Sequence, residues 1–187
     1  MQSLPQEEYH GRYRKAGENK MNSHSDHTLH FEAVNSRNRA EVEHLEVFAE
    51  QSGFIESVTQ CLQEADKLEL WTIGSEADRR RCWRPVGVYD GDALIGFAMY
   101  GFFWEYLPFG RLWLDRLLID KKYQGKGYGK RVVLALLDRL RTEYSCDTIY
   151  LSVYETNSHA IHLYQQIGFH FNGEYDTNGE HVMVYAF

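Results

Sequence analysis

The sequence predicts an α/β fold: a mixed sheet with helices on both faces. Segments with the period-two alternation of strands are interleaved with segments of helical period, in the order βααβββαβαββ. The dipeptides Asp90-Gly91 and Asn178-Gly179 each separate two strand patterns, which is typical of tight antiparallel hairpins. An apolar run ending at Ile119 leads through a glycine-rich loop into a helical pattern. These observations favour a single domain from residue 27 to residue 187.

The expected strands are rich in β-branched and aromatic residues, and most are bounded by turn residues. The first alternates apolar and polar side chains, as in a strand with one buried face. Gly96 inside a strand indicates a bulge or a close approach of another backbone. In chain order the expected strands are 28–34, 85–89, 93–104, 111–119, 148–154, 169–175 and 181–187.

The expected helices are marked by their ends. Asn35 or Ser36 is a suitable N-cap for a helix to about residue 50, and Ser57 with Gln60 forms a capping box for the next. The connection between them, 51–56, carries an aromatic residue and a carboxylate and is expected to form one wall of a substrate cleft. Residues 70–84 are harder to place, because a strand-like start is followed by a run of charges. The two later helices are expected from the glycine loop to about 142 and over 157–167.

Composition excludes several classes of protein. The chain has 187 residues, with 27 acidic and 20 basic side chains and a net charge of -7, which argues against nucleic acid as a partner. Residues 1–26 are polar and are expected to form a flexible tail. No stretch is long and apolar enough to span a membrane, and the three cysteines show no paired spacing, so a cytoplasmic protein is expected. No metal site is predicted, because the histidines near the N-terminus lack partners at ligand spacing.

The glycine loop, 124–129, has the features of a phosphate site. Glycines at alternate positions allow successive backbone N–H groups to turn toward one anion, and the following helix adds the positive end of its dipole. Lys126, Lys130 and Arg131 add positive charge. A mononucleotide P-loop is unfavoured, because Gln124 stands where its first glycine is required and Arg131 where it needs Ser or Thr. The glycine spacing also differs from the dinucleotide fingerprint.

Two motifs resemble those of the GNAT superfamily of N-acetyltransferases. The first is Gln-x-x-Gly-x-Gly over 124–129, which resembles the superfamily's acyl-CoA pyrophosphate loop. The second is Asn157-x-x-Ala160-x-x-Leu163-Tyr164, followed by Ile-Gly-Phe at 167–169. Segments such as 96–101, 113–116 and 171–174 look like the bacterial spermine/spermidine acetyltransferases of the Blt type. The resemblance covers about residues 28–187 and implies the GNAT fold.

The resemblance implies acetyl-CoA as co-substrate. Backbone N–H groups of the glycine loop would bind the pyrophosphate, and strand-edge groups would bind the pantetheine arm. Tyr164 would donate a proton to the departing thiolate, because a tyrosine with a pKa of about 10 is protonated at neutral pH. The cofactor-binding residues expected on this basis are Leu117, Leu118, Ile119, Gln124, Gly125, Lys126, Gly127, Tyr128, Gly129, Lys130, Asn157 and Tyr164.

The acceptor must also lose a proton. An ammonium of pKa about 10.4 costs roughly 4.6 kcal/mol to deprotonate at pH 7, and a carboxylate of ordinary pKa is too weak a base to do this in one step. Asp115 is the acidic group nearest the position where some GNAT members carry a glutamate base, and strand alternation puts it on the same face as Trp113. We expect Asp115 to be a proton relay or an amine anchor. The expected substrate-binding residues are Glu56, Glu105, Tyr106 and Asp115.

The expected reaction is acetyl transfer from acetyl-CoA to a primary amine, by direct attack in a ternary complex. The resemblance favours a polyamine such as spermine or spermidine as the acceptor. A protein N-terminus, an amino acid or an aminoglycoside remains an alternative, as does a non-catalytic acyl-CoA-binding module that regulates a partner. A homodimer is a further possibility.

Overall fold

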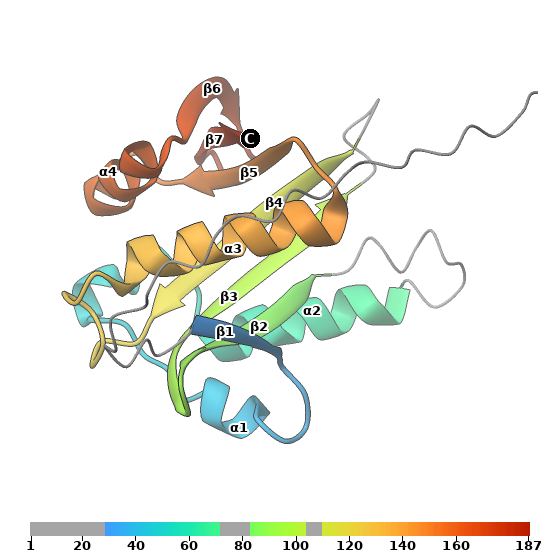
Figure 1. Cartoon of the computed structure of the whole chain (residues 1–187), viewed down its shortest axis with the longest axis vertical. Coiled ribbons are helices and arrows are strands. Elements are labelled where there is room, and N and C mark those ends of the chain that lie inside the picture. The colour runs from blue at the N-terminus through green and yellow to red at the C-terminus, as the bar shows by residue number, and fades with distance from the viewer. Residues whose placement is uncertain (1–28, 72–82, 104–109) are drawn as a thin grey trace, which may run out of the picture.

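The computed structural model describes residues 29–71, 83–103 and 110–187. The expected tail, 1–26, and the expected substrate residues Glu105 and Tyr106 lie outside these ranges. The order of elements is the predicted βααβββαβαββ, with one added 3-10 helix (Figure 1). The elements are β1 Leu29–Ala33, α1 Arg39–Val42, η1 Ala49–Gln51, α2 Val58–Trp71, β2 Arg84–Asp90, β3 Ala93–Phe103, β4 Arg111–Ile119, α3 Tyr128–Tyr144, β5 Thr148–Val153, α4 Ser158–Ile167, β6 His170–Tyr175 and β7 His181–Ala186.

The described strands form one mixed sheet in the order β1-β2-β3-β4-β5-β7-β6. Neighbours pair antiparallel except β4 and β5, which are parallel. The two predicted hairpins are confirmed, with Gly91 at φ 59° and Gly179 at φ 81°. The sequence did not predict that β7 would insert between β5 and β6.

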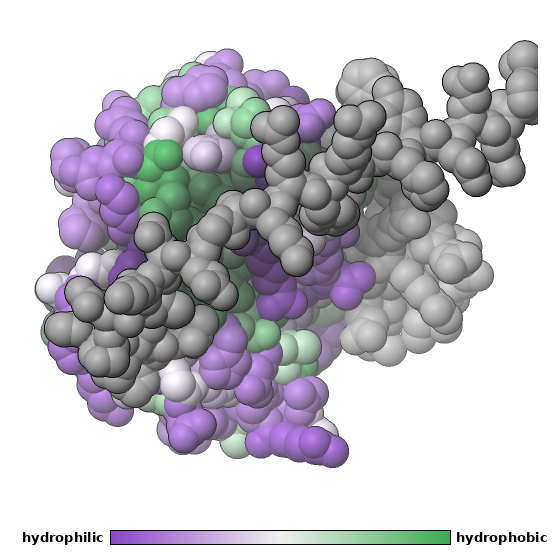
Figure 2. All heavy atoms as spheres, in the orientation of Figure 1, coloured by the Kyte–Doolittle hydropathy of each residue, from purple (hydrophilic) through white to green (hydrophobic). Residues whose placement is uncertain are grey.

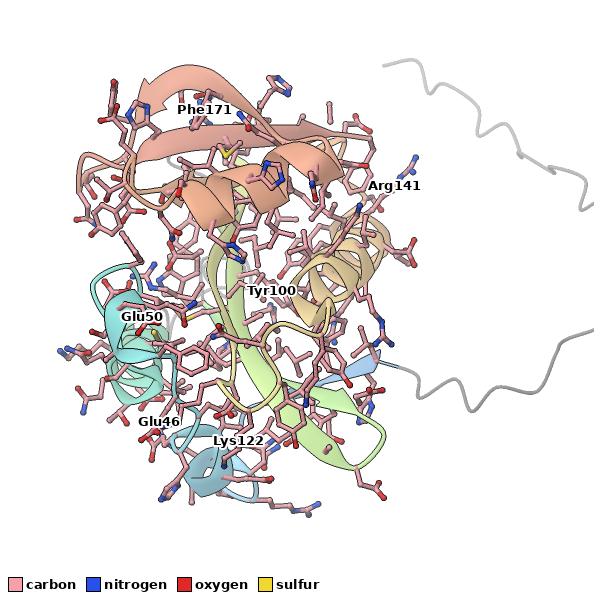
Figure 3. The ribbon with its side chains drawn as sticks, turned by 90° about the vertical axis from the view of Figure 1, so that its left-hand side faces the viewer. Glu46, Glu50, Tyr100, Lys122, Arg141 and Phe171 are labelled. Carbon is pink, nitrogen blue, oxygen red and sulfur yellow. The ribbon has the colours of Figure 1, made fainter. Side chains whose placement is uncertain are left out.

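Helices cover both faces of the sheet, as predicted. On one face α3 packs its buried residues, Val132, Val133, Leu136, Leu137 and Leu140, against the sheet, and α4 adds to this core. On the other face Val42 of α1 and Cys61 and Leu62 of α2 form a second core. Figure 3 shows α2 and α3 on opposite sides of the central strands. The central strands are therefore covered by helices on both faces.

Polar residues dominate the surface seen in Figure 2. Apolar residues line a recess that lies between the positions of α4 and α3 in Figure 1. No helix in the described ranges is both long and apolar enough to cross a lipid bilayer. Within the same ranges no three His, Cys, Asp or Glu side chains are grouped to hold a metal ion.

The prediction of one helix running to about residue 50 is wrong, because the observed helix is much shorter. α1 ends at Val42, and a separate 3-10 turn follows at Ala49–Gln51. The backbone between them is held by the segment after β4: Glu46 N donates to Asp120 Oδ2 (3.1 Å), and Lys121 N donates to Glu46 O (2.8 Å). These long-range bonds satisfy backbone groups that a continuous helix would have used, so tertiary pairing overrides the local helical pattern.

Other predicted helix ends are confirmed. Ser57 N donates to Gln60 Oε1 (3.0 Å) and Gln60 N donates to Ser57 Oγ (3.3 Å), a capping box at the start of α2. Asn157 Oδ1 accepts from Ala160 N (3.3 Å) at the start of α4, and Gly168 ends that helix at φ 119°. Trp71, which looked like strand, belongs to the last turn of α2.

β4 and β5 separate toward their C-terminal ends. Only Trp113 and Tyr150 are paired in register between them. β4 also carries a bulge, because Met99 pairs with Arg116 and Tyr100 with Leu114, which leaves Asp115 without a partner in β3. The bulge breaks the alternation on which the predicted face of Asp115 was based. The separated strand ends open a cleft in the middle of the sheet.

Candidate active site

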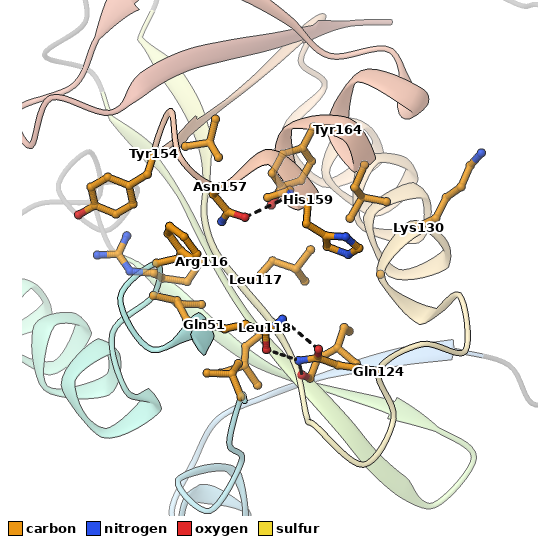
Figure 4. Close-up of a pocket in the computed structure, with 18 of the residues that line it drawn as sticks. Gln51, Arg116, Leu117, Leu118, Gln124, Lys130, Tyr154, Asn157, His159 and Tyr164 are labelled. Carbon is orange, nitrogen blue, oxygen red and sulfur yellow. Dashed lines mark hydrogen bonds between the residues drawn. The ribbon is translucent and has the colours of Figure 1, made fainter. Parts of the chain in front are cut away.

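The cleft has a volume of about 730 Å³ and is lined by the separated ends of β4 and β5, the glycine loop, α4 and the segment before α2 (Figure 4). Among the predicted site residues, Glu56, Asp115, Leu117, Leu118, Ile119, Gln124, Gly125, Gly127, Tyr128, Gly129, Lys130, Asn157 and Tyr164 line it. The predicted wall, 51–56, contributes Gln51, Phe54, Ile55 and Glu56. The structure thus brings most of the predicted site together.

The glycine loop lies between β4 and α3 with its backbone open to the cleft. Gly125 and Gly127 have φ values of 73° and 78°, and a Cβ at either position would meet nothing within 4 Å. Glycine is required there by backbone conformation rather than by crowding. Because α3 begins at Tyr128, its unpaired N–H groups and positive dipole end lie at the loop.

Two side chains hold the loop in place. Asp120 is buried, and its Oδ1 accepts from Lys122 N (2.9 Å). Gln124 and Gln51 exchange a reciprocal pair of amide hydrogen bonds of 3.0 and 2.9 Å, and Gln124 Nε2 also donates to Ile119 O (2.9 Å). The amide pair, visible in Figure 4, ties the glycine loop to the segment before α2. No local pattern predicts the contact with Gln51, because 73 residues separate the two glutamines.

Lys126 is the predicted loop residue that does not line the cleft. Its Nζ donates to Lys122 O (3.0 Å) and lies 5.3 Å from the centre of the Tyr123 ring. Lys130, by contrast, lies at the cleft on the first turn of α3. The positive charge at this end of the cleft therefore comes from Lys130 and the helix terminus rather than from the Lys126 side chain.

Tyr164 reaches the cleft from the middle of α4. The helix is oriented by its Asn157 cap, and the Tyr164 ring packs edge-on to Phe169, with ring centres 5.6 Å apart. The residue as a whole is partly exposed, but desolvation of its hydroxyl raises the pKa of Tyr164 to about 12. The phenol therefore stays protonated across the physiological pH range and is available as a proton donor.

Carboxylates gather around Arg116 at the other end of the cleft. Arg116 forms ion pairs with Asp115, with Glu56 (Nε to Oε2, 2.7 Å) and with Glu64 (3.7 Å). The side chains of Arg116 and Asp115 are 16% and 15% exposed. Desolvation, opposed by the charge of Arg116, raises the pKa of Asp115 to about 6. One cation faces three carboxylates, so this end of the cleft is negative overall.

Glu180, Ser152 and Tyr154 complete this end of the cleft, and none was predicted. Desolvation, then repulsion from Asp176, raises the pKa of Glu180. The charge of Glu180, then desolvation, raises the pKa of Tyr154. The only sequence signal was a carboxylate at the end of a predicted hairpin turn. His159 also lines the cleft without having been predicted.

Comparison with known proteins places this geometry in a family. The model of the family described as "Acetyltransferase (GNAT) family" matches residues 50–169 of this chain. The chain is 46% identical over 160 residues to the "Spermine/spermidine N(1)-acetyltransferase" of Bacillus subtilis (strain 168), covering 84% of this chain and 97% of that protein.

Two solved structures share the fold. The spermidine N-acetyltransferase from Vibrio cholerae, in complex with CoA and spermine, matches with a TM-score of 0.59 and 20% identity over 84% of this chain and 95% of that chain. The aminoglycoside acetyltransferase AAC(6')-Ib, in complex with coenzyme A, matches with a TM-score of 0.68 and 18% identity over 85% and 95%. At such identities these two likenesses establish the fold alone.

A mixed sheet split by a cleft, with a glycine loop and a helix N-terminus at one end, defines the class of acyl-CoA-dependent transferases. The chain belongs to the acetyltransferase (GNAT) family. It is an N-acetyltransferase, and acetyl-CoA is its co-substrate.

The residues of the cleft fit this co-substrate. The open backbone at Gly125 and Gly127 leaves room for an anion against the N-terminus of α3. The edge of β4 at Leu117–Ile119, unpaired by β5, offers backbone groups to an extended amide-containing chain. When bound, acetyl-CoA supplies an activated acetyl thioester.

We expect Gly127→Ala to weaken CoA binding about tenfold. A side chain at φ 78° costs about 1–2 kcal/mol, and the loop relieves this strain by turning its N–H groups away from the anion. Calorimetric titration with CoA measures the change. Gly53→Ala is the matched control, because a Cβ there also meets nothing within 4 Å and Gly53 does not line the CoA cleft. A CoA titration of Gly127→Ala that superimposes on the wild type would contradict the role of the loop.

Proposed function

We propose that the protein acetylates a primary amine of a polyamine, such as spermidine or spermine, by direct attack on acetyl-CoA in a ternary complex. The observation that carries the proposal is the negative end of the cleft, where Glu56, Asp115 and Glu180 line the cavity around the single cation of Arg116. A substrate with several ammonium groups matches this charge. The relative from Bacillus subtilis, named for spermine and spermidine, supports the same acceptor.

The two ends of the cleft have opposite chemistry. We propose that the N–H groups of residues 124–129 bind the pyrophosphate, and that Leu117 and Ile119 bind the pantetheine arm. The thioester then lies between the separated ends of β4 and β5, within reach of Tyr164 on one side and of the carboxylates on the other. This arrangement allows the amine to attack directly, with no acetylated side chain as an intermediate.

Each proposed residue has one role. Tyr164 protonates the departing CoA thiolate, and its raised pKa keeps it protonated until then. Asp115, held by Arg116, and Glu56 anchor ammonium groups of the acceptor. Arg116 forms ion pairs with both carboxylates and so holds them in place at the cleft, where they offer negative charge to the substrate.

A thiol-release assay with acetyl-CoA tests the acceptor. Spermidine, spermine, putrescine, amino acids and aminoglycosides are compared at equal concentration. We expect spermidine and spermine to give the highest kcat/KM and their KM values to rise with salt, because charge attraction is screened. If an amino acid or an aminoglycoside exceeds every polyamine, the acceptor assignment is wrong, although the acetyltransferase activity stands.

We expect Glu56→Gln to raise the KM for spermidine about fivefold with little change in kcat. The substitution keeps the size of the side chain and removes one charge, and an exposed ion pair contributes up to about 1 kcal/mol. Asp92→Asn is the control, since Asp92 is exposed and lies outside the cleft. An unchanged KM in Glu56→Gln would remove Glu56 from the acceptor site.

A further inference from the structure

Glu180 occupies a fixed position at the mouth of the split between β4 and β5. It precedes His181, which pairs with Val153 at the end of β5. Its backbone is held on both sides by one residue of the hairpin turn: Glu180 N donates to Asp176 Oδ1 (2.9 Å), and Asp176 N donates to Glu180 O (3.0 Å). The side chain lines the same cavity as Tyr164. The turn therefore presents one half-buried carboxylate to the cleft.

The groups facing Glu180 come from four elements. Ser152 of β5 and Tyr154, which follows the same strand, line the cleft together with Glu180. Arg116 of β4 attracts its charge, whereas Asp176 of its own turn and Glu56, which precedes α2, repel it. Desolvation is the largest influence, and with the two acidic neighbours it outweighs Arg116, so the pKa of Glu180 is raised.

Two other acidic groups of the cleft are engaged differently, and a further one, Glu50, is exposed on η1. Asp115 is ion-paired with Arg116, and Glu56 approaches Nε of the same guanidinium at 2.7 Å. The guanidinium of Arg116 therefore balances part of the negative charge of both carboxylates. Within the described residues no ion pair to Glu180 is found, so protonating its carboxylate breaks no ion pair. Asp115 also has a raised pKa, but its protonation would break its ion pair with Arg116, so among Glu56, Asp115 and Glu180 the geometry favours Glu180 as the proton acceptor.

We propose that Glu180 is the group that takes the proton the acceptor amine must lose before it attacks the thioester. The inference rests on the proposed acetyl transfer to an amine but not on the amine being a polyamine. The ammonium gives its first proton to the Glu180 carboxylate, directly or through one water, and Glu180 returns it to solvent. The nitrogen lone pair then forms the C–N bond with the thioester carbonyl carbon.

The remaining transfers balance the reaction. As the addition complex collapses, the C–S bond breaks and the sulfur receives the proton of the Tyr164 hydroxyl. The nitrogen loses its second proton, which restores the Tyr164 phenol. The products are the acetylated amine, CoA as the thiol and one proton released through Glu180. No oxidant, reductant or further reactant is required.

The test is the pH dependence of Glu180→Gln, which keeps the size of the side chain and removes its charge and its ability to take a proton. We expect kcat at pH 7 to fall about 100-fold, the lower range for general base catalysis. In the variant, kcat/KM should rise about tenfold per pH unit between pH 7 and pH 9, because only the neutral amine reacts. The wild type should change less over the same interval. The affinity for CoA, measured by calorimetry, should be unchanged.

Two further variants complete the design. Glu180→Asp keeps a carboxylate and should recover part of kcat and the flatter pH profile. Glu155→Gln removes an exposed carboxylate outside the cleft and should match the wild type. A higher KM with normal kcat in Glu180→Gln would make Glu180 an anchor and overturn the proposal, as would an unaltered pH profile.

The outcome is separable from that of the proposed function. The acceptor panel on the wild type decides the substrate, and the pH profiles are measured with whichever amine is turned over fastest. Preference for another amine overturns the polyamine assignment and leaves the Glu180 test valid. Absence of turnover with every amine overturns both proposals.

Discussion

Tyr164→Phe is expected to lower kcat by about 10²–10⁴-fold while leaving the affinity for CoA unchanged. The substitution removes one hydroxyl and keeps the ring, so the edge-on contact with Phe169 is preserved. Without the hydroxyl, the CoA thiolate must leave unprotonated or take a proton from water, and general acid catalysis of this size is lost. Steady-state kinetics with the preferred amine and calorimetric titration with CoA give the two quantities.

Tyr123→Phe is the matched control for that prediction. Tyr123 lies beside the glycine loop, packs edge-on to Tyr128 with ring centres 6.2 Å apart, and does not line the cleft. Its hydroxyl can be removed without touching the proposed chemistry, so turnover should match the wild type. Turnover of Tyr164→Phe equal to that of Tyr123→Phe would remove Tyr164 from the proton-donating role.

Gly96→Ala is expected to lower the free energy of unfolding by about 3 kcal/mol, the upper range for forcing extra atoms into a packed core. A Cβ at Gly96 would lie 2.4 Å from Leu118 O and 3.2 Å from Ile119 Cδ1. The first atom belongs to the backbone and cannot move aside alone, so β3 and β4 must separate. For a chain of this length the corresponding shift in Tm is about 6–12 °C, measured by thermal unfolding followed by circular dichroism.

The same substitution should also weaken CoA binding, because Leu118 and Ile119 belong to the edge of β4 that lines the cleft. Gly53→Ala again serves as the control and should change the stability by less than about 0.5 kcal/mol. Stability of Gly96→Ala equal to that of Gly53→Ala would show that the close approach at Gly96 is not a constraint on the fold.

Short-range chemistry made much of this fold predictable. The hairpin turns at Asp90-Gly91 and Asn178-Gly179, the capping box at Ser57 and the Asn157 cap all depend on residues within four positions of one another. The helix expected up to residue 50 failed for the opposite reason. Its local pattern competes with bonds from Glu46 to Asp120 and Lys121, more than seventy residues away.

The candidate site divides in the same way. Its proposed CoA end, from Leu117 to Lys130, is one continuous stretch, so the spacing of its glycines and the family resemblance of that motif were enough to predict it. Tyr164 was placed by a second motif with its own register. Both resemble family patterns, and the comparisons confirm the family.

The sequence by itself determined the order of elements, the glycine loop and the presence of a tyrosine at the expected distance from it. Only the tertiary structure decided which residues form the proposed acceptor end of the cleft. The bulge at Asp115 changed which way β4 presents its side chains, and the insertion of β7 beside β5 brought Glu180 to the cleft. Strand order and register bring together residues that are far apart in the sequence. The negative charge of the proposed acceptor end depends on these long-range contacts.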